Sequence, residues 1–537
     1  MPGVIILPSL GGRSLLSRAV AFALATAIVA ALPLGQAAAG VSDDGVRDRL
    51  AAEARLELLA ELAAVRADAV AEGYDDLVAE IDTLAAPRPA SPLARRPGRV
   101  RVRPADADDR RHELERRLAR ARDGYAAGLF RLSRSAVSAG HPAEAFHRLE
   151  EAARVQPDYK PVRQQLGDQR VGEVWMTPFE AVMQRERKVW DDRFGWLPRE
   201  HIARYAAGER MYQGQWRTVA DIAAIRSASR RAWQVETDHF VVHSNHSLER
   251  AAALAGRLED YHRFLKRRFT LLFDAPALRR TLLEEGPIPS RDKHTVRDFA
   301  SQAEYVARLS PKMPGVEISN GIYLTRDRTA YFFANDNAEA TARPEEVLYH
   351  EVLHQVLYEA DRRDRAIAAD AHFWPVEGLA SYFETFTPEA VRPDDAGDLD
   401  PNAPLIGDID HPRLYRARER LLQETQHTPL VEFSSLGMRA FQRGETLEEI
   451  QGRYAQATGL THFFLHFGAA EPLGPGRYRD AFLQHVREIY DARIRRATPL
   501  WQLTGMPPEQ LDRQYREYLR ELDAAARFAV LAERRPE

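Results

Sequence analysis

The 537-residue chain contains no cysteine. This absence excludes disulfide bridges, thiolate metal ligands and a cysteine nucleophile. Stability must therefore come from core packing, and any metal site must use His, Asp, Glu and water as ligands. A large net charge is also lacking, because 75 Lys and Arg residues nearly balance 79 Asp and Glu residues. The resulting formal charge of −4 argues against a nucleic-acid partner.

Long apolar runs are scarce, and only residues 19–34 form one that could interact with a membrane. Arg13 and Arg18 precede this run and small residues follow it at 36–40, which is the pattern of a secretory signal peptide. The run is shorter than the roughly 20 residues that a membrane-spanning helix needs. We therefore expect residues 1–39 to be removed, leaving an exported protein without a membrane segment. An uncleaved membrane anchor is the alternative.

The rest of the chain has a globular composition, with 45% hydrophobic and 29% charged residues, so several folded domains are expected. Apolar residues spaced by three and four predict helices within 40–86 and 111–170. Residues 87–110 are rich in Pro and Arg and are predicted to be a linker.

Residues 111–170 fit one tetratricopeptide-like helical hairpin. The positions that match are Leu132, Gly140, Ala145, Leu149, Ala152 and Pro157. A single repeat favours a helical scaffold, and binding of a protein partner through these N-terminal helices is the alternative. In residues 171–232, three tryptophans each follow a glycine and precede Thr or Pro. This repeat predicts small strand–turn–helix modules packed by their tryptophans.

From residue 233 the patterns predict a small sheet and several helices. Alternating or continuous apolar residues predict strands at 237–244, 293–299, 321–324 and 329–333. A helix is expected at 247–269 and another at 301–309. Pro344 suits the first turn of a further helix, because no Gly or Pro interrupts the chain from there to residue 360.

That last helix carries His350, Glu351 and His354. Two histidines four residues apart lie about one turn apart on one helix face, so both imidazoles can reach one ion. Glu351 then lies beside the metal, where it can accept a proton from an activated water. Catalytic zinc usually has three protein ligands and one open position, and Glu377 can supply the third ligand.

Chance alone would produce His-Glu-x-x-His in roughly a few per cent of chains of this kind. The context strengthens the pattern, because Val347, Leu357 and Tyr358 share the helix face of the histidines and predict that this face is buried. Burying two histidines and a glutamate there would be unfavourable unless a metal or partner groups satisfied them. A metzincin is excluded, since Leu357 and Ala360 stand where that class needs Gly and a third His.

The two motifs, His350–Glu351–x–x–His354 and residues 376–380 (Val-Glu-Gly-Leu-Ala), resemble those of the gluzincin metallopeptidases. This clan contains thermolysin-like and aminopeptidase-N-like zinc enzymes. More closely, roughly residues 235–525 look like a group of bacterial exported proteins with a peptidase-MA-like domain. The resemblance implies one Zn²⁺ ion, held by His350, His354 and Glu377.

The resemblance also implies the fold class, which is mostly helical α+β. A zincin-like catalytic domain is expected at 233–400, followed by a helical C-terminal lobe at 401–530. In such lobes a Tyr or His donates a hydrogen bond to the tetrahedral intermediate. Tyr454 is the first candidate for this role and His462 the second, and a packed core residue is the alternative reading of either.

Two further groups of residues follow from the same arrangement. Ser381 and Glu384 lie one and two turns after Glu377, on the side suited to orient the imidazoles; relatives often have Asp at the first of these places. An edge strand of gluzincins binds the extended substrate, and the segments at Gly321 and Tyr331 are the candidates for it. An ordinary hairpin is the alternative.

The sequence thus predicts an exported zinc metallopeptidase that hydrolyses peptide or protein substrates through a metal-activated water, with Glu351 as general base. No exopeptidase motif precedes residue 344, which favours internal cleavage. Two alternatives stay open. One is a non-catalytic exported scaffold that binds protein partners through its N-terminal helices. The other is a metal-dependent amidase acting on cell-wall or other amide substrates.

Overall fold

The computed structural model describes residues 43–86, 108–227, 231–273, 292–334, 344–361, 364, 366–387, 406–422, 426–470 and 473–533. The predicted signal peptide lies outside the described residues, as do residues 87–107 of the predicted linker. The described chain divides into two compact units, one of residues 43–175 and the other of residues 176–533.

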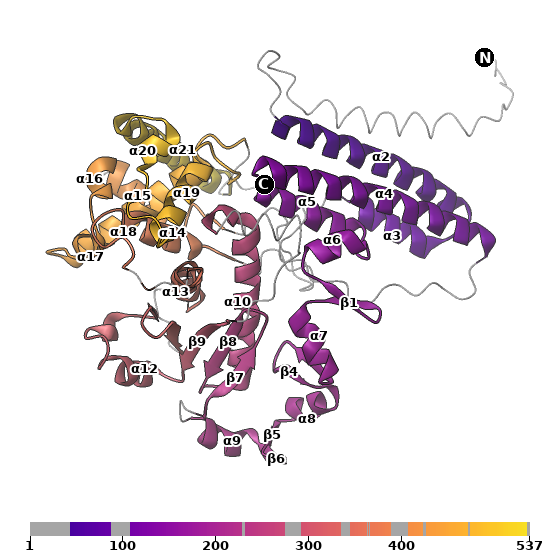
Figure 1. Cartoon of the computed structure of the whole chain (residues 1–537), viewed down its shortest axis with the longest axis horizontal. Coiled ribbons are helices and arrows are strands. Elements are labelled where there is room, and N and C mark those ends of the chain that lie inside the picture. Colours follow the sequence, from indigo (N-terminus) through magenta and orange to yellow (C-terminus); the bar gives the residue numbers. More distant parts are fainter. Residues whose placement is uncertain are drawn as a thin grey trace, which may run out of the picture. The chain divides into compact units, whose positions relative to one another are not determined.

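The first unit is a helical bundle (Figure 1). Its helices are α2 (Asp43–Ala71), α3 (Asp75–Ala85), α4 (Asp109–Ala139), α5 (Pro142–Val155) and α6 (Lys160–Gln165). The side chain of Asp108 caps the start of α4, and Gly140 ends it with a positive φ of 91°. α4 has 31 residues and α5 has 14, so this hairpin is strongly asymmetric. A tetratricopeptide identity therefore stays a prediction.

Three hairpins, each followed by a helix, come next in the chain. They are β1 (Gln169–Val171) and β2 (Val174–Met176) before α7 (Pro178–Arg185), β3 (Lys188–Asp191) and β4 (Gly195–Pro198) before η1 (Arg199–His201) and α8 (Ile202–Ala206), and β5 (Glu209–Tyr212) and β6 (Gln215–Thr218) before α9 (Val219–Arg226). Thr177 and Thr218 cap the first and third helices. Trp196 packs edge-on against Trp190, and Trp216 against Tyr205.

A five-stranded mixed sheet lies at the centre of the second unit. Its order is β10 (Ile322–Leu324), β11 (Thr329–Phe333), β9 (His294–Phe299), β8 (Phe240–Ser244) and β7 (Trp233–Glu236). The central pairs β8–β9 and β9–β11 are parallel, whereas the outer pairs β7–β8 and β10–β11 are antiparallel. β10 and β7 are therefore the edge strands of this sheet.

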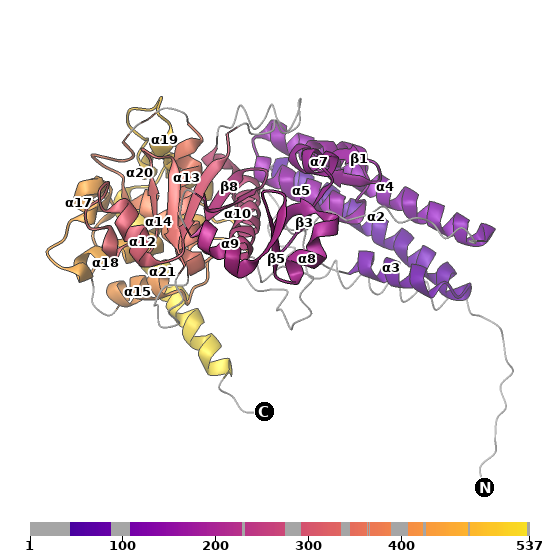
Figure 2. The same cartoon turned by 90° about the horizontal axis from the view of Figure 1, so that it is seen from below.

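Helices cover both faces of the sheet because the side chains of β11 alternate between two cores. Ala330 and Phe332 belong to the main core, whereas Tyr331 and Phe333 pack in a smaller core with Tyr305 of α12 (Gln302–Leu309). On the main-core side lie α10 (Leu248–Arg268) and α13 (Pro344–Glu359). Figure 2 shows both helices beside the sheet.

The remaining helices form a C-terminal lobe around α18 (Figures 1 and 2). They are α14 (Trp374–Phe383), α15 (Pro412–Leu422), α16 (Leu430–Ser434), α17 (Met438–Gln442), α18 (Leu447–His466), α19 (Arg479–Tyr490), α20 (Leu500–Thr504) and α21 (Pro508–Glu533). α14 contacts both α13 and α18. It therefore joins the lobe to the helix that carries the His-Glu-x-x-His motif.

The predicted α+β class, mostly helical with a small sheet, is confirmed at this level. Among the helices described, none is both long and apolar enough to span a bilayer.

Candidate metal centre

His350 and His354 lie on the buried side of α13, one turn apart. Their ring centroids are 5.0 Å apart and their planes make an angle of 76°. The Nε2 atom of His350 is 3.3 Å from Oε2 of Glu377, and that of His354 is 3.8 Å from the same oxygen. The three side chains thus direct one atom each at a common point.

Glu377 reaches this point because α14 is embedded in the core. Every residue of α14 is buried, and its second residue is Pro375, which suits a first helical turn. Gly378 allows the close approach of α18, since a Cβ there would lie 2.5 Å from the carbonyl oxygen of Ala457 and from Oγ1 of Thr461. The glycine of the second motif is therefore required by helix packing, and this packing fixes the neighbouring glutamate.

The other nitrogen of each imidazole is held by a group from elsewhere in the chain. Nδ1 of His350 lies 2.8 Å from Oε1 of Glu384, whose Oε2 accepts a hydrogen bond of 2.7 Å from Nε of Arg413. Nδ1 of His354 lies 3.2 Å from the hydroxyl of Tyr490. These partners fix both ring orientations, so that Nε2 faces Glu377 in each case.

The electrostatics of the centre favour positive charge. Burial by itself would lower the pKa of His350, but the hydrogen bonds to Glu377 and Glu384 outweigh it and raise the pKa to about 10. Burial likewise opposes ionisation of Glu384, yet the charge of Arg413 and the contact with His350 bring its pKa down to about 2. For Glu377 too, the two histidines overcome burial and hold its pKa well below the usual range.

Glu351 lies beside this group without belonging to it. Its Oε2 accepts a hydrogen bond of 2.8 Å from the backbone N–H of Tyr323 in β10. Burial raises the pKa of Glu351 above its ordinary value, while the charges of His350 and His354 act in the opposite direction. A carboxylate with a raised pKa is closer to the range in which general bases work at neutral pH.

The residues fit a divalent transition metal. Ligands at about 2.0–2.1 Å from a tetrahedral zinc lie roughly 3.3 Å from one another, and the measured separations of 3.3 and 3.8 Å are near this value. His350, His354 and Glu377 form one of the two groups among the described residues that could hold a metal ion. Two imidazoles and a carboxylate are also a donor set of zinc enzymes.

The structure places Tyr454 near this centre and His462 away from it. The guanidinium of Arg413 lies over the Tyr454 ring, 5.3 Å from its centroid. Burial, followed by the charge of Glu377, raises the pKa of Tyr454 above its ordinary value. His462 is eight residues further along α18, about 12 Å at 1.5 Å per residue. It contacts the Tyr518 hydroxyl at 2.6 Å and the Gly407 carbonyl at 3.3 Å.

His462 is therefore a packed core residue with both ring nitrogens engaged, and its predicted role as a hydrogen-bond donor to the tetrahedral intermediate is corrected. Ser381 is corrected as well. Its hydroxyl is buried and has no hydrogen-bond partner within the described part of the chain, so it orients neither imidazole. Glu384, the other residue expected to orient an imidazole, makes the contact with His350 described above.

Of the two candidates for the substrate-binding edge strand, Tyr331 and Gly321, only Gly321 lies next to an edge strand. Tyr331 lies in β11, whose backbone pairs with β10 on one side and with β9 on the other, so no further strand can add to it. This prediction was wrong. Gly321 directly precedes the edge strand β10, and a Cβ there would lie 2.8 Å from side-chain atoms of Phe332 and Val347. A glycine is thus needed where the strand begins.

Sequence reasoning missed Arg413 and Tyr490. They are 29 and 136 residues from the side chains they contact, and no spacing in the sequence links them. Only the residue types gave a signal, since a buried carboxylate near a metal helix needs a cationic partner.

In comparisons with known proteins, no family model and no curated sequence matches the chain.

Proposed function

We propose that this chain is an exported, zinc-dependent peptide hydrolase of the gluzincin type. The observation that carries the proposal is the convergence of the His350 and His354 Nε2 atoms on one oxygen of Glu377. The Glu351 carboxylate lies beside these side chains and makes no hydrogen bond to His350, His354 or Glu377; its hydrogen bond comes from the backbone N–H of Tyr323. A purely structural metal site has no use for such a group.

When bound, zinc supplies a Lewis acid that activates water and polarises the scissile carbonyl. The chain's own residues provide the rest of the chemistry. His350, His354 and Glu377 would hold the ion, and the contacts of Glu384 and Tyr490 keep the two imidazoles in the orientation this requires. Glu351 accepts the proton of the attacking water and delivers it to the leaving nitrogen.

Tyr454 is the proposed donor to the developing oxyanion. Its side chain comes from the lobe, under the influence of the charges of Glu377 and Glu351. The high pKa keeps its hydroxyl protonated, as a hydrogen-bond donor must be. The neighbouring Arg413 adds a positive charge on the same side of the centre.

An extended peptide backbone is the substrate class that the sheet edge supports. β10 is an edge strand, and its Tyr323 N–H points away from β11 toward Glu351. The sheet edge and the proposed general base are therefore adjacent. A peptide that added to β10 as a further strand would lie along the base. The export signal proposed for residues 1–39 would take the enzyme to the periplasm, cell envelope or extracellular space.

The proposal is tested with zinc-loaded protein and a peptide library. Glu351→Gln should keep the metal content of the wild type, while hydrolysis falls about 10²–10⁴-fold because the general base is lost. His350→Ala should lose one metal equivalent and the activity together. Glu200→Gln is the matched control, since it removes an exposed carboxylate in η1 and should change neither quantity.

Two results would overturn the proposal. One is a wild-type protein that binds no zinc at His350. The other is undiminished hydrolysis by Glu351→Gln.

A further inference from the structure

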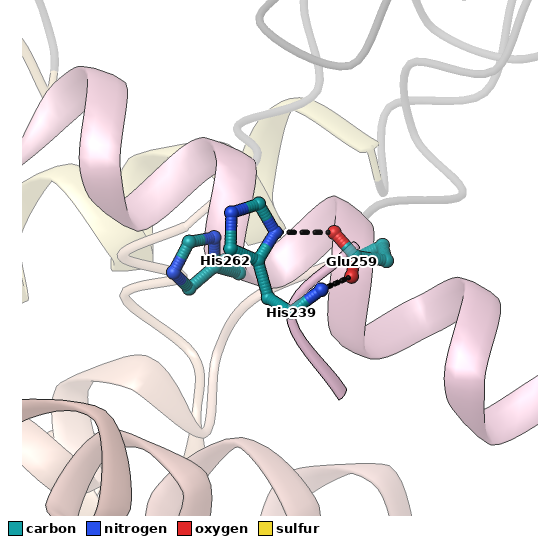
Figure 3. Close-up of side chains that lie close together, drawn as sticks. All are labelled: His239, Glu259 and His262. Carbon is teal, nitrogen blue, oxygen red and sulfur yellow. Dashed lines mark hydrogen bonds and ion pairs between the residues drawn. The ribbon is translucent and has the colours of Figure 1, made fainter. Parts of the chain in front are cut away.

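A second group of two histidines and a glutamate lies where the turn between β7 and β8 meets α10. His239 is in the turn between the two strands, and Glu259 and His262 lie three residues apart on α10 (Figure 3). Oε2 of Glu259 is 2.9 Å from Nδ1 of His239. Oε1 of Glu259 accepts a hydrogen bond of 2.6 Å from the backbone N–H of His239. One ligand atom from each residue lies within 4.8 Å of the others.

His262 is the unexplained member of this group. It is 6% exposed, and neither of its ring nitrogens makes a hydrogen bond to any residue that the structure describes. The His239 ring stacks on it with the ring centroids 3.9 Å apart, and a carboxylate oxygen of Glu259 lies within 4.8 Å of one of its nitrogens. Both ring nitrogens of His262 are therefore available as ligand atoms, and one of them lies within 4.8 Å of the ligand atoms of His239 and Glu259. The other buried histidines described below all have partners.

We propose that His239, Glu259 and His262 bind a second divalent transition-metal ion, of the zinc class. The ion would occupy the position of the proton that His239 shares with Glu259, and it would give the free nitrogen of His262 a partner. Two imidazoles and one carboxylate suit zinc, cobalt or nickel better than magnesium or calcium, which prefer oxygen ligands. No part of this inference depends on the activity proposed above.

The geometry predicts that this site binds more weakly than the first. Imidazole lone pairs lie in the ring plane, and the rings of His239 and His262 are nearly parallel, with an angle of 28° between them. The His239 ring must turn before both rings can point at one ion. Its side chain is 36% exposed, which leaves room for that turn. At the first centre the rings already converge at 76°.

The charges around the second group are mixed. Asp238 adds a carboxylate next to His239; burial, then the charge of Glu259, raises the pKa of Asp238 to about 6. A cation would relieve this repulsion between two carboxylates. Lys266 opposes the binding of a cation, because this residue lies one helix turn after His262. Its ammonium is 3.4 Å from the centroid of the Phe273 ring. Arg263 adds a smaller opposing charge.

A bound ion would act as a structural cross-link. It would join the β7–β8 turn to α10, and the carbonyl of His239 already accepts a 2.8 Å hydrogen bond from His294 N at the start of β9. Both oxygens of Glu259 are engaged by His239, so Glu259 cannot play the part that Glu351 plays at the first centre. The second ion would therefore stabilise the sheet edge rather than activate water.

The test is equilibrium dialysis of the full chain against low-micromolar free zinc, followed by metal analysis. The wild type should bind two equivalents, His262→Ala one, His350→Ala one and the double variant none. His246→Ala, which removes an exposed histidine outside both groups, is the matched control and should bind two. Cobalt substitution gives a second readout, because His262→Ala should remove one of two sets of absorption bands.

The outcomes separate the two proposals. One equivalent in the wild type and in His262→Ala, with none in His350→Ala, would overturn the second site and leave the peptidase proposal standing. One equivalent in His350→Ala and in the wild type, with none in His262→Ala, would do the reverse. If His262→Ala does not fold, Glu259→Gln and His239→Ala replace it, and unchanged zinc binding in both would overturn the inference.

Discussion

The two histidines of α13 and three histidines of the C-terminal lobe all lie largely inside the protein, yet their surroundings differ in kind. His350 and His354 face carboxylates, whereas His462, His466 and His485 face hydroxyls and carbonyl oxygens. Burial lowers the pKa of His466 and of His485 to about 4, while the carboxylates raise that of His350 to about 10. Among these five histidines, the charge of the partner rather than burial separates the candidate metal ligands from the core residues. A carboxylate partner alone does not make a metal site, because His427 pairs with Asp512 at 2.9 Å without a second histidine beside it among the residues described.

The group at His239 combines both kinds of histidine. His239 has a carboxylate partner, and although burial opposes its protonation, the charge of Glu259 raises its pKa. His262 has no such partner, and burial lowers its pKa well below the usual value. The two rings also lie nearly parallel, at 28°, whereas those of His350 and His354 converge at 76°, and this geometry is the reason to expect a weaker metal site there.

The largest expected effect separates Tyr454 from His462. Tyr454→Phe should lower kcat about 10²–10³-fold, the usual loss on removing one oxyanion donor, with zinc content unchanged. His462→Gln should leave kcat per folded molecule unchanged and lower the Tm, since it disturbs the contacts with Tyr518 and Gly407. Steady-state kinetics with parallel metal analysis and thermal unfolding measure both. Equal loss of kcat in the two variants would remove the distinction between Tyr454 as a group of the site and His462 as a core residue of the lobe.

A smaller effect is expected when the partner of His350 loses its charge. Glu384→Gln should weaken zinc binding about 10–100-fold, because the imidazole loses the carboxylate that orients it. Competition with a chromophoric chelator measures the affinity. Glu432→Gln, at an exposed position of α16, is the control. An affinity equal to that of the wild type would mean that the contact at 2.8 Å does not tune the ligand.

The smallest effect concerns the lobe and appears as a pH dependence. Desolvation keeps the pKa of His485 at about 4, below its ordinary value of 6.5. As pH falls from 6.5 toward 4, the unfolded chain binds a proton that the folded chain does not, so stability decreases. His485→Asn should reduce this slope by about 1.4 kcal/mol per pH unit. Chemical denaturation at several pH values measures it, with His246→Ala as control. An unaltered slope would show that His485 titrates normally.

The secondary structure near the site could largely be predicted from sequence. Strands expected at 293–299 and 329–333 correspond to β9 and β11, and the helix expected at 247–269 corresponds to α10. Here the apolar periodicity is strong and the elements are bounded by polar residues. The strand β7 was missed, and its residues 233–236 pair with β8 only because the turn at 237–239 brings them together. Strand pairing is a long-range property that no local pattern specifies.

In the candidate site, too, the residues related by local helix geometry could be predicted, whereas those placed by the packing of separate elements could not. His350, Glu351 and His354 could be grouped from sequence because one helix turn fixes their relative positions. Ser381 and Glu384 could not be told apart by spacing, since the rotation of α14 against α13 decides which side chain reaches Nδ1 of His350. Tyr331 was misassigned because sequence identifies a strand but not its place in the sheet.

By itself, the sequence determined the chemistry available to this protein. Without cysteine, its metal ligands had to be imidazoles and carboxylates, and the helical repeat placed two of them on one face. The tertiary structure decided which of the 17 histidines face a carboxylate. It brought Glu377 and Glu384 from α14 and its C-terminal end, Arg413 from α15 and Tyr490 from α19 to the surroundings of the α13 histidines, and it paired His239 with Glu259 elsewhere. The physical reason is that local geometry is set by neighbouring residues, whereas the charge around a buried group depends on helix packing.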